Sequence, residues 1–329
     1  MPTTNIRWGI LGAGNIAKKF AEGLKQLPEA TLQAVGSRDL AKAQAFASAF
    51  GPAKAYGSYH ALVSDAEVDA IYVATPHPFH MEHSMLCLAH GKAVLCEKPF
   101  AINAGEAREM IKLSRHKNVF LMEAMWTRFL PYIVKLRELL KENAIGEVRM
   151  IQADFGFRAG VDPKGRLFDL ALGGGGLLDV GVYPISLASM ILGKPTQTAS
   201  LAHLGETGVD EQNACVLGYD KGRLALVSSA VRTNTPHEAF ILGTEGKIKL
   251  HAPWWAGKVL TLYRDGKKEE TIEVGFEGNG YQFEAAEVAR CLAAGKIESD
   301  IMPHHETVAI METLDELRAQ WGMKYPMEE

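Results

Sequence analysis

The residues near the start of the chain with a recognisable chemical use are the glycines of Gly12-x-Gly14-x-x-Ala17. Gly12 permits a tight turn, Gly14 lets a pyrophosphate approach the backbone where a Cβ would collide, and Ala17 allows a helix to pack closely on a strand. The amides of Asn15 and Ile16 would begin a helix whose positive end attracts phosphate. The pattern predicts a dinucleotide site, with a plain structural turn as the alternative.

The surroundings of these glycines are those that a dinucleotide site requires. Ile6 to Leu11 is a short apolar run that predicts a buried strand, and a helical pattern with Phe20 and Leu24 on one stripe continues to Pro28. Glycine spacing alone is a weak signal, but the order of strand, glycine turn and helix makes it specific. We therefore expect a bound dinucleotide here.

The end of the second predicted strand, Thr31 to Ser37, indicates which dinucleotide is preferred. NAD sites usually carry an acidic residue there for the ribose 2′-hydroxyl, but this chain has Ser37-Arg38-Asp39. A hydroxyl and a guanidinium suit a 2′-phosphate, which predicts NADP in preference to NAD. Asp39 could also reach the ribose, although a role as N-cap of the predicted helix Leu40 to Phe50 would account for it.

The segment Thr75-Pro76-His77-Pro78-Phe79-His80 follows the predicted strand Ala70 to Ala74. We expect Thr75, Pro76 and His80 to lie in a loop under the cofactor. Histidines at this spacing could instead suggest a metal, but no carboxylate or cysteine completes a ligand set. We therefore predict no metal site.

A charged pair, Glu97-Lys98, follows the predicted strand Ala93 to Cys96, and Pro99 fixes the next turn. A surface salt bridge is the ordinary interpretation of such a pair. The carboxyl ends of strands in a parallel sheet form the ligand crevice, so a functional lysine is favoured at this position.

Strand-like and helical stretches alternate up to residue 123, which predicts an α/β Rossmann domain with a doubly wound parallel sheet at 1–123. Residues 124–329 show a helix from Pro131 to Glu142 and then many β-rich runs separated by turn signals. This second part predicts an α+β domain with a large, mostly antiparallel sheet.

Composition limits the classes of function. At 329 residues the chain exceeds the usual size of one core, and a net charge of −4 gives no basic field for nucleic acid. We find no apolar run of membrane-spanning length and no signal peptide before the first strand, so we expect a cytoplasmic protein with a small-molecule partner. The four cysteines have no paired spacing, which favours reduced core thiols.

A second glycine run, Gly173 to Gly176, precedes an apolar helical stretch that contains Asp179 and Tyr183. Such a run permits close backbone approach to a ligand, so we predict that it meets the cofactor. Residues four apart share one face of a helix. An N-cap role for Asp179 and a half-buried position for Tyr183 are the alternatives.

Together these motifs resemble the glucose-fructose oxidoreductase, inositol dehydrogenase and rhizopine-catabolism (Gfo/Idh/MocA) family of NAD(P)-dependent oxidoreductases. Within the family the resemblance is strongest to the dimeric dihydrodiol dehydrogenases and the NADP-dependent D-xylose dehydrogenases. It is carried by Gly9-x-x-Gly12-x-Gly14, Ser37-Arg38-Asp39, Ala55-Tyr56-Gly57-Ser58-Tyr59, Thr75-Pro76, Val94-Leu95-Cys96-Glu97-Lys98-Pro99, Glu123-Ala124-Met125-Trp126-Thr127-Arg128-Phe129 and the stretch from Gly174 to Tyr183. The resemblance implies that the second domain binds substrate and forms a homodimer, or a higher oligomer, through one open face of its sheet.

The resemblance also implies roles for the site residues. Many members carry histidine as the acid/base at this position. This chain has Tyr183 there, and the dihydrodiol and xylose dehydrogenases also have tyrosine. A phenol has a reference pKa of about 10, so Tyr183 would need the Lys98 ammonium within hydrogen-bonding range to act as a base. Lys98 would orient the substrate oxygen, Asp179 would hold a second hydroxyl or position Lys98, and Glu97 would hold the nicotinamide ribose. Lys98 as proton carrier is the alternative.

We expect Trp126, Phe155 and Tyr281 to contribute to an aromatic substrate pocket, with Arg128 at a polar edge of the substrate. Ordinary core positions for the rings, and solvated surface for the arginine, are the alternatives.

The predicted activity is hydride transfer between NADP and a secondary alcohol of a sugar, a cyclic polyol or a trans-dihydrodiol. A dinucleotide-binding sensor of the same fold without turnover is the alternative. The joint presence of Lys98, Asp179 and Tyr183 favours the enzyme, because a sensor has no need of all three.

Overall fold

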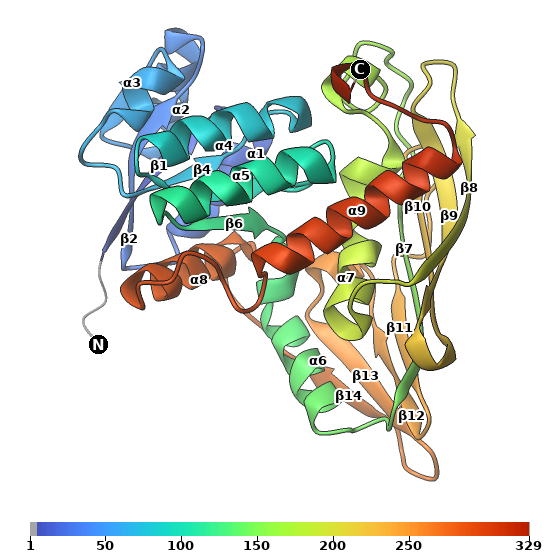
Figure 1. Cartoon of the computed structure of the whole chain (residues 1–329). Helices are drawn as coiled ribbons and strands as arrows, with labels where there is room; N and C mark the ends of the chain where they lie inside the picture. Colours follow the sequence, from blue (N-terminus) through green and yellow to red (C-terminus); the bar gives the residue numbers. More distant parts are fainter. Residues whose placement is uncertain (1–4, 329) are drawn as a thin grey trace. The chain divides into compact units, whose positions relative to one another are not determined.

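In a computed structural model, which describes residues 5–328, the chain forms two compact units (Figure 1). Unit 1 contains the residues up to Phe129 together with Glu277–Val308, and unit 2 contains Leu130–Phe276 and the residues from Ala309 onward. The predicted division at residue 123 lies close to the first of these boundaries. It differs at the second, because a late segment of the chain returns to unit 1.

Unit 1 is built on a six-stranded parallel sheet with the strand order β3-β2-β1-β4-β5-β6. The strands are β1 (Ile6–Leu11), β2 (Ala30–Gly36), β3 (Lys54–Tyr56), β4 (Ala70–Val73), β5 (Ala93–Glu97) and β6 (Leu121–Ala124). The strand order reverses between β1 and β4, which is the switch point at which doubly wound sheets bind their ligands. The predicted parallel, doubly wound sheet is confirmed.

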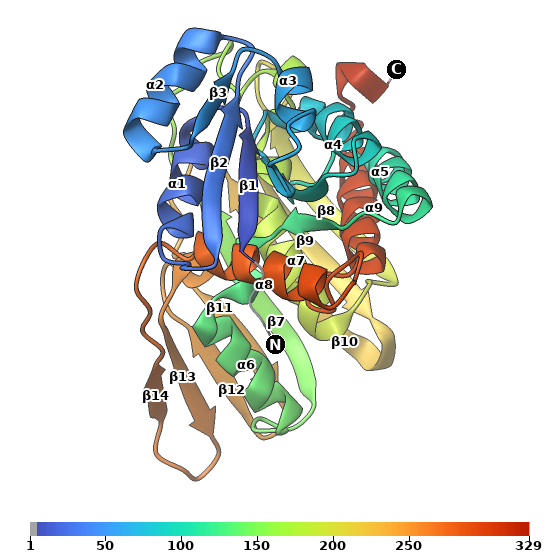
Figure 2. The same ribbon diagram turned by 90° about the vertical axis from the view of Figure 1, so that its left-hand side faces the viewer.

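Helices cover both faces of this sheet, with α1 and α2 on one side and α4 and α5 on the other (Figure 2). The helices of unit 1 are α1 (Asn15–Leu24), α2 (Leu40–Phe50), α3 (Tyr59–Val63), α4 (His80–Ala89), α5 (Ala104–Lys117) and α8 (Tyr281–Ala293). α1 buries Phe20, whose ring centroid lies 5.1 Å from that of Trp8 and 3.9 Å from that of Tyr72. α8 packs against α1, which is why the late segment belongs to unit 1.

Unit 2 is built on an eight-stranded sheet with the order β14-β13-β12-β11-β7-β10-β9-β8. The strands are β7 (Val148–Gly156), β8 (Gln197–Leu204), β9 (Asp210–Tyr219), β10 (Arg223–Ala230), β11 (Ala239–Gly243), β12 (Gly246–Leu250), β13 (Val259–Arg264) and β14 (Glu270–Glu273). β7 and β10 pair in parallel and the other neighbours pair antiparallel. The predicted, mostly antiparallel sheet is therefore confirmed.

One face of the unit 2 sheet carries helices (Figure 1). These are α6 (Pro131–Lys141), α7 (Val182–Leu192) and the part of α9 (His304–Gln320) that belongs to unit 2. Glu312 and Glu316 of α9 bind Lys194 and Thr198 at and near the start of β8, at 2.5 and 2.7 Å. Side chains of β8 alternate between exposed and partly buried positions, as expected for a sheet with one covered face.

The stretch Leu170–Leu192 corrects one expectation about membranes. It is 23 residues long and apolar enough in composition to span a bilayer, although we expected no run of that length. The structure buries 89 % of its most apolar window, which is the pattern of a core helix. All four cysteines are free and buried, as expected for core thiols.

Candidate active site

The glycine turn after β1 leaves room for a phosphate group. Gly12 has a φ of 102°, and a Cβ there would lie 3.0 Å from the carbonyl oxygen of Ala74. Gly14 is the N-cap residue of α1, and a Cβ on it would meet no atom within 4 Å. No side chain among the described residues caps α1, so the amides of Asn15 and Ile16 can bind an anion. These residues fit the pyrophosphate of a dinucleotide.

Two charged residues follow β2, an exposed arginine, Arg38, and an acid, Asp39, that caps α2. The Asp39 carboxylate accepts a hydrogen bond of 2.9 Å from the Ala41 amide and caps α2, so its structural role is confirmed. Ser37 is buried, and its Oγ accepts a hydrogen bond of 3.2 Å from the Asp39 amide. Arg38 is exposed and lies over the Phe79 ring, 5.8 Å from its centroid. The exposed guanidinium at this place suits a 2′-phosphate.

His80 occupies a different setting from the predicted one. Thr75 and Pro76 begin the loop after β4, and His80 is fully buried behind it. Its Nε2 lies 2.8 Å from the carbonyl oxygen of Thr75, and its Nδ1 lies 2.8 Å from that of Pro99. Burial lowers the pKa of His80 to about 4. The imidazole therefore joins the loops after β4 and β5, which corrects the expectation that it contacts a cofactor. No cluster of potential ligands among residues 5–328 is arranged to hold a metal ion.

The carboxyl end of β5 carries a buried carboxylate beside Lys98. Glu97 is 4 % exposed and accepts hydrogen bonds from the Tyr72 hydroxyl and, at 3.1 Å, from the Lys98 amide. Glu284 of α8 is fully buried, and neither of its carboxyl oxygens has a hydrogen-bond partner within the described chain. Burial, and then the charge of Glu97, raise the pKa of Glu284 well above its ordinary range. Glu284 was not predicted, because an acid at that place in a helix gives no local sign of its burial.

Aromatic and charged residues of unit 1 divide into two settings. Trp126 and Tyr281 stack with ring centroids 4.8 Å apart and planes 13° apart, and both rings are buried, as in the core alternative. Arg128 is only 2 % exposed and forms an ion pair of 2.6 Å with Glu306. Its guanidinium is used inside unit 1, which corrects the expectation that Arg128 meets a polar edge of the substrate.

Tyr183 lies against a cluster of aromatic rings in unit 2. Phe155 of β7 stacks on Trp255 with centroids 3.4 Å apart, and its centroid lies 5.3 Å from that of Tyr183. His237 packs edge-on against Trp255 at 4.6 Å. Trp255 was not predicted as a site residue. The pair Trp254-Trp255 is visible in the sequence, but only the fold of the segment between β12 and β13 brings it to β7.

Asp179 is 4 % exposed and binds the Arg166 guanidinium at 2.8 and 3.4 Å. It lies inside a π-helical turn, η4 (Leu177–Gly181), that continues into α7, so it is not an N-cap. Arg166 was not predicted, because it lies in an irregular loop without a local pattern. The π-helical turn was not predicted either, and such turns often occur at functional sites.

The predicted catalytic residues are divided between the two units. Asp179 and Tyr183 lie on one continuous helical segment of unit 2, whereas Lys98 lies at the end of β5 in unit 1. The structure thus places two of the three together, and the meeting of Lys98 with Tyr183 stays a prediction.

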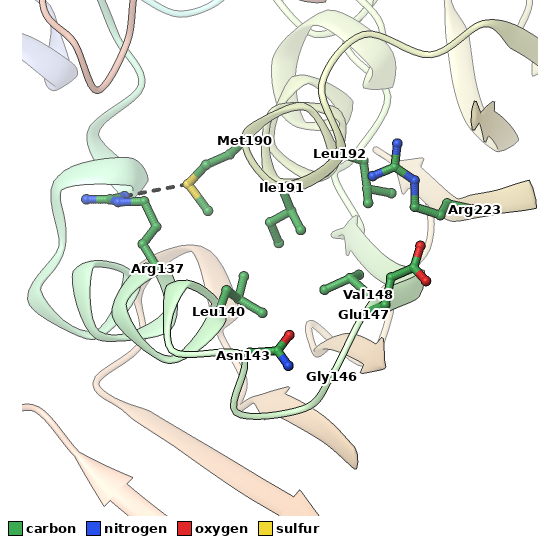
Figure 3. Close-up of a pocket in the computed structure, with 10 residues that line it drawn as sticks. All are labelled: Arg137, Leu140, Asn143, Gly146, Glu147, Val148, Met190, Ile191, Leu192 and Arg223. Atoms are coloured by element: carbon green, nitrogen blue, oxygen red, sulfur yellow. Dashed lines mark hydrogen bonds between the residues drawn. The ribbon is translucent and has the colours of Figure 1, made fainter. Parts of the chain in front are cut away.

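A pocket of about 430 Å³ lies elsewhere in unit 2 (Figure 3). It is lined by Arg137, Leu140, Asn143, Gly146, Glu147, Val148, Met190, Ile191, Leu192 and Arg223. Arg137 donates a hydrogen bond of 3.5 Å to the sulfur of Met190. None of the predicted site residues lines this pocket, so it is separate from the candidate active site.

Comparison with known proteins agrees with this geometry. The family model described as "oxidoreductase family, NAD-binding Rossmann fold" matches residues 6–125, and the one described as "GFO/IDH/MocA C-terminal domain" matches residues 133–249. The trans-1,2-dihydrobenzene-1,2-diol dehydrogenases of Mus musculus and Homo sapiens are 39 % and 37 % identical to the chain, each over 332 residues that cover 98 % of this chain and 99 % of the relative. Fold, site and relatives together define a nicotinamide-dinucleotide oxidoreductase. The chain belongs to the Gfo/Idh/MocA family.

The fold also recurs in solved structures. A 3-ketoreductase from Actinomadura kijaniata, in complex with NADP and TDP-benzene, matches with a TM-score of 0.85 at 24 % identity, over 96 % of this chain and 98 % of that one. An aldose-aldose oxidoreductase from Caulobacter crescentus, complexed with glycerol, matches with a TM-score of 0.88 at 22 % identity, over 97 % and 98 %. At these identities the likeness shows the shared fold.

Proposed function

We propose that this protein oxidises a secondary alcohol of a trans-dihydrodiol, a sugar or a cyclic polyol, with NADP as the hydride acceptor. The observation that carries the proposal is the position of Tyr183 beside the stacked rings of Phe155 and Trp255. A phenol next to an aromatic surface suits a planar dihydrodiol or the apolar face of a sugar. The similarity to trans-1,2-dihydrobenzene-1,2-diol dehydrogenases supports a trans-dihydrodiol as the first substrate to test.

The residues of the chain have separate tasks in this proposal. Tyr183 takes the proton of the substrate hydroxyl, and Lys98 donates a hydrogen bond to the same oxygen and stabilises its developing charge. An ammonium within hydrogen-bonding range also favours the phenolate of Tyr183. Asp179, held by Arg166, accepts a hydrogen bond from a second hydroxyl of the substrate.

The dinucleotide would be held by unit 1. The amides of Asn15 and Ile16 bind the pyrophosphate, Arg38 and Ser37 bind the 2′-phosphate, and Glu97 binds the nicotinamide ribose. When bound, NADP supplies the hydride acceptor. The exposed Arg38 at the end of β2 supports NADP over NAD, because a guanidinium there suits a 2′-phosphate.

The test is the initial rate of NADPH formation, followed by absorbance, with a trans-dihydrodiol, D-xylose, D-glucose and myo-inositol, and with NAD⁺ as the comparison cofactor. We expect turnover with one substrate class and a preference for NADP⁺. Tight NADPH binding without turnover of any substrate would contradict the proposal and favour a sensor.

Two variants test the roles of the acid/base groups. We expect Tyr183→Phe to lower kcat by roughly 100-fold or more, as loss of a general base does, and Lys98→Met to lower it as well. Tyr263→Phe, at a partly exposed tyrosine of β13, is the matched control. Substantial turnover in Tyr183→Phe together with none in Lys98→Met would assign the proton to the lysine.

We further propose that the open sheet face of unit 2 pairs two copies of the chain. Leu201, Val216 and Leu226 lie on adjacent strands, and all three are exposed, Leu201 by 83 %. An apolar patch of this kind is typical of an interface. We expect sedimentation velocity to show a dimer, and Val216→Asp to convert it to a monomer. Val161→Asp, at an exposed loop residue, is the control, and a monomeric wild type would contradict the proposal.

A further inference from the structure

Three polar residues form a buried hydrogen-bonded set beneath the second glycine run of unit 2. Asp210, the first residue of β9, is fully buried, and Asn213 lies three residues further along the same strand. Asn213 pairs with Ser229 of β10 in the sheet register. Its amide nitrogen donates hydrogen bonds of 2.8 Å to Asp210 Oδ2 and of 2.7 Å to Ser229 Oγ. The set is therefore rigidly held by two neighbouring strands.

This set touches both ends of the π-helical turn. Asp210 Oδ2 accepts a hydrogen bond of 2.8 Å from the amide of Leu177, the first residue of the turn. At the other end, a Cβ on Gly181 would lie only 2.7 Å from Ser229 Oγ. The turn is thus held at its start by a hydrogen bond to Asp210, and its last residue packs closely against the Ser229 hydroxyl.

The glycine run is shaped around the same carboxylate. Gly175 has a φ of 119°, a conformation that side chains rarely adopt, and a Cβ on it would overlap Asp210 Oδ1. Glycine at this place lets the backbone close over the acid. The sequence of the run is therefore explained by what the protein itself places there.

Asp210 has no ion-pair partner among the ion pairs of the described residues. Arg318, whose charge lowers the pKa of Asp210, already binds Glu328 at 2.6 Å and Asp315 at 2.7 Å. A buried acid without its own cation is costly unless its hydrogen bonds serve a purpose. Its direct partners are the Leu177 amide and Asn213, so its effect is concentrated on the turn.

We propose that Asp210 is a positioning residue that fixes the π-helical turn and thereby sets the direction of Asp179 and Tyr183. Asp179 lies within the turn, and Tyr183 follows Gly181 by two residues on the same helical segment. A change of one residue in helical register rotates every later side chain by about 100°. Loss of the anchor would thus move Tyr183 away from Phe155 without touching the cofactor residues of unit 1. The inference rests on the proposed function only in calling Asp179 and Tyr183 catalytic.

The test combines hydrogen–deuterium exchange with steady-state kinetics on the full chain. In Asp210→Ala we expect amide exchange in residues 176–183 to speed up by about tenfold or more, because the Leu177 amide loses its hydrogen-bond partner. The strand Gly246–Leu250 should keep its protection. Asp210→Asn keeps an acceptor oxygen and should restore most of the protection, and Asp220→Asn, at the exposed residue directly after β9, is the matched control.

The kinetic part distinguishes positioning from mere support of the core. We expect kcat of Asp210→Ala to fall by roughly tenfold or more while KM for NADP⁺ stays unchanged, since unit 1 is untouched. If Asp210→Ala does not fold, Ser229→Ala provides the same comparison from the other end of the turn.

Two results would overturn the proposal. One is unchanged exchange in residues 176–183 of Asp210→Ala, and the other is faster exchange throughout unit 2, which would make Asp210 an ordinary core residue. A wild type without turnover would contradict the proposed function, while the exchange data would still decide whether Asp210 anchors the turn.

Discussion

The two glycine runs of this chain are similar in sequence and end differently in space. After β1, the turn leads to a helix end that no described side chain caps, and a Cβ on Gly14 would meet nothing within 4 Å. In unit 2, the run ends at Leu177, whose amide is bound by the buried carboxylate of Asp210. The first helix end can receive an anion from outside, and the second is already bound by a carboxyl group of the protein.

The second run shows a use of glycine that was not predicted. We expected Gly173 to Gly176 to meet the cofactor, which stays a prediction, and two of these glycines also make room for protein atoms. A Cβ on Gly174 would lie 2.9 Å from the carbonyl oxygens of Leu167 and Asp169, and one on Gly175 would overlap Asp210. Glycine spacing predicts that something comes close to the backbone, and only the fold determines what it is.

The largest expected effect comes from placing a capping side chain at the uncapped N-terminus of α1. Gly14 has an extended backbone that any residue can adopt, so Gly14→Asp would cap α1 and place a carboxylate where a phosphate would lie. We expect NADPH affinity to fall by roughly 100-fold or more, while the free energy of unfolding rises by only about 0.3 kcal/mol, since glycine is itself a tolerated N-cap. Fluorescence titration with NADPH measures the first and chemical denaturation the second. Gly160→Asp is the control, and unchanged affinity would show that α1 binds no phosphate.

In the glycine run of unit 2, an added side chain should lower the free energy of unfolding instead of raising it. Gly175→Ala would clash with Asp210 at a positive φ, and we expect it to lower the free energy of unfolding by about 2–4 kcal/mol. Gly222→Ala has a φ of 68° but no neighbour within 4 Å, so it isolates the backbone cost of about 1 kcal/mol. Urea denaturation compares the two. Equal losses would mean that Asp210 exerts no steric constraint on the run.

A pH dependence follows from the buried carboxyl group of Asp210. Burial raises the pKa of Asp210 to about 7, although its Asn213 and Leu177 hydrogen bonds and Arg318 act the other way. Cys215 and Tyr325 are the other titratable groups that interact with it. The folded chain binds this proton more tightly than the unfolded chain, whose Asp has a pKa of about 3.9. The stabilisation is therefore complete below about pH 4 and is lost as the pH rises through about 7.

Asp210→Asn should remove this slope. We expect the wild type to lose roughly 1–3 kcal/mol more stability than the variant between about pH 5 and about pH 7. Urea denaturation at the two pH values gives the difference. Burial raises the pKa of Glu123 to about 7 in unit 1, so Glu123→Gln is the matched comparison. Parallel slopes in wild type and Asp210→Asn would contradict the assignment.

The smallest expected effect concerns the choice between NAD and NADP at the end of β2. Arg38→Gln removes the guanidinium proposed for the 2′-phosphate, and we expect the ratio of NAD to NADP dissociation constants to fall by roughly tenfold. Lys42→Gln, an exposed change on α2, should leave the ratio as it is. An unchanged ratio in Arg38→Gln would remove this residue from the choice of cofactor.

Local patterns in the sequence predicted most of unit 1. The helix Leu40–Phe50 and its Asp39 cap were predicted as observed, because capping and helical periodicity are local signals. In unit 2, β9 begins at Asp210. Its first residues are polar yet partly buried, so they show no apolar alternation. These residues include the carboxylate that anchors the π-helical turn, which explains why that anchor could not be predicted.

The site was predictable where a residue acts through its own backbone neighbourhood. Gly12 and Gly14 belong to that class. His80 and Arg128 were misplaced, because their partners come from segments far away in the chain, Pro99 and Glu306. Charge and residue type show what a side chain can bind, but long-range packing decides whether a buried partner binds it first.

The return of the chain to unit 1 has a consequence for biosynthesis. Asn279 donates a hydrogen bond of 2.8 Å to the carbonyl oxygen of Lys19, and the Leu121 amide of β6 donates one of 3.0 Å to the carbonyl oxygen of Ile297. Unit 1 therefore cannot complete its fold during synthesis until the late segment Glu277–Val308 has also been translated. A fragment that stops at Phe129 would expose the surface that α8 covers, so expression trials need the whole chain.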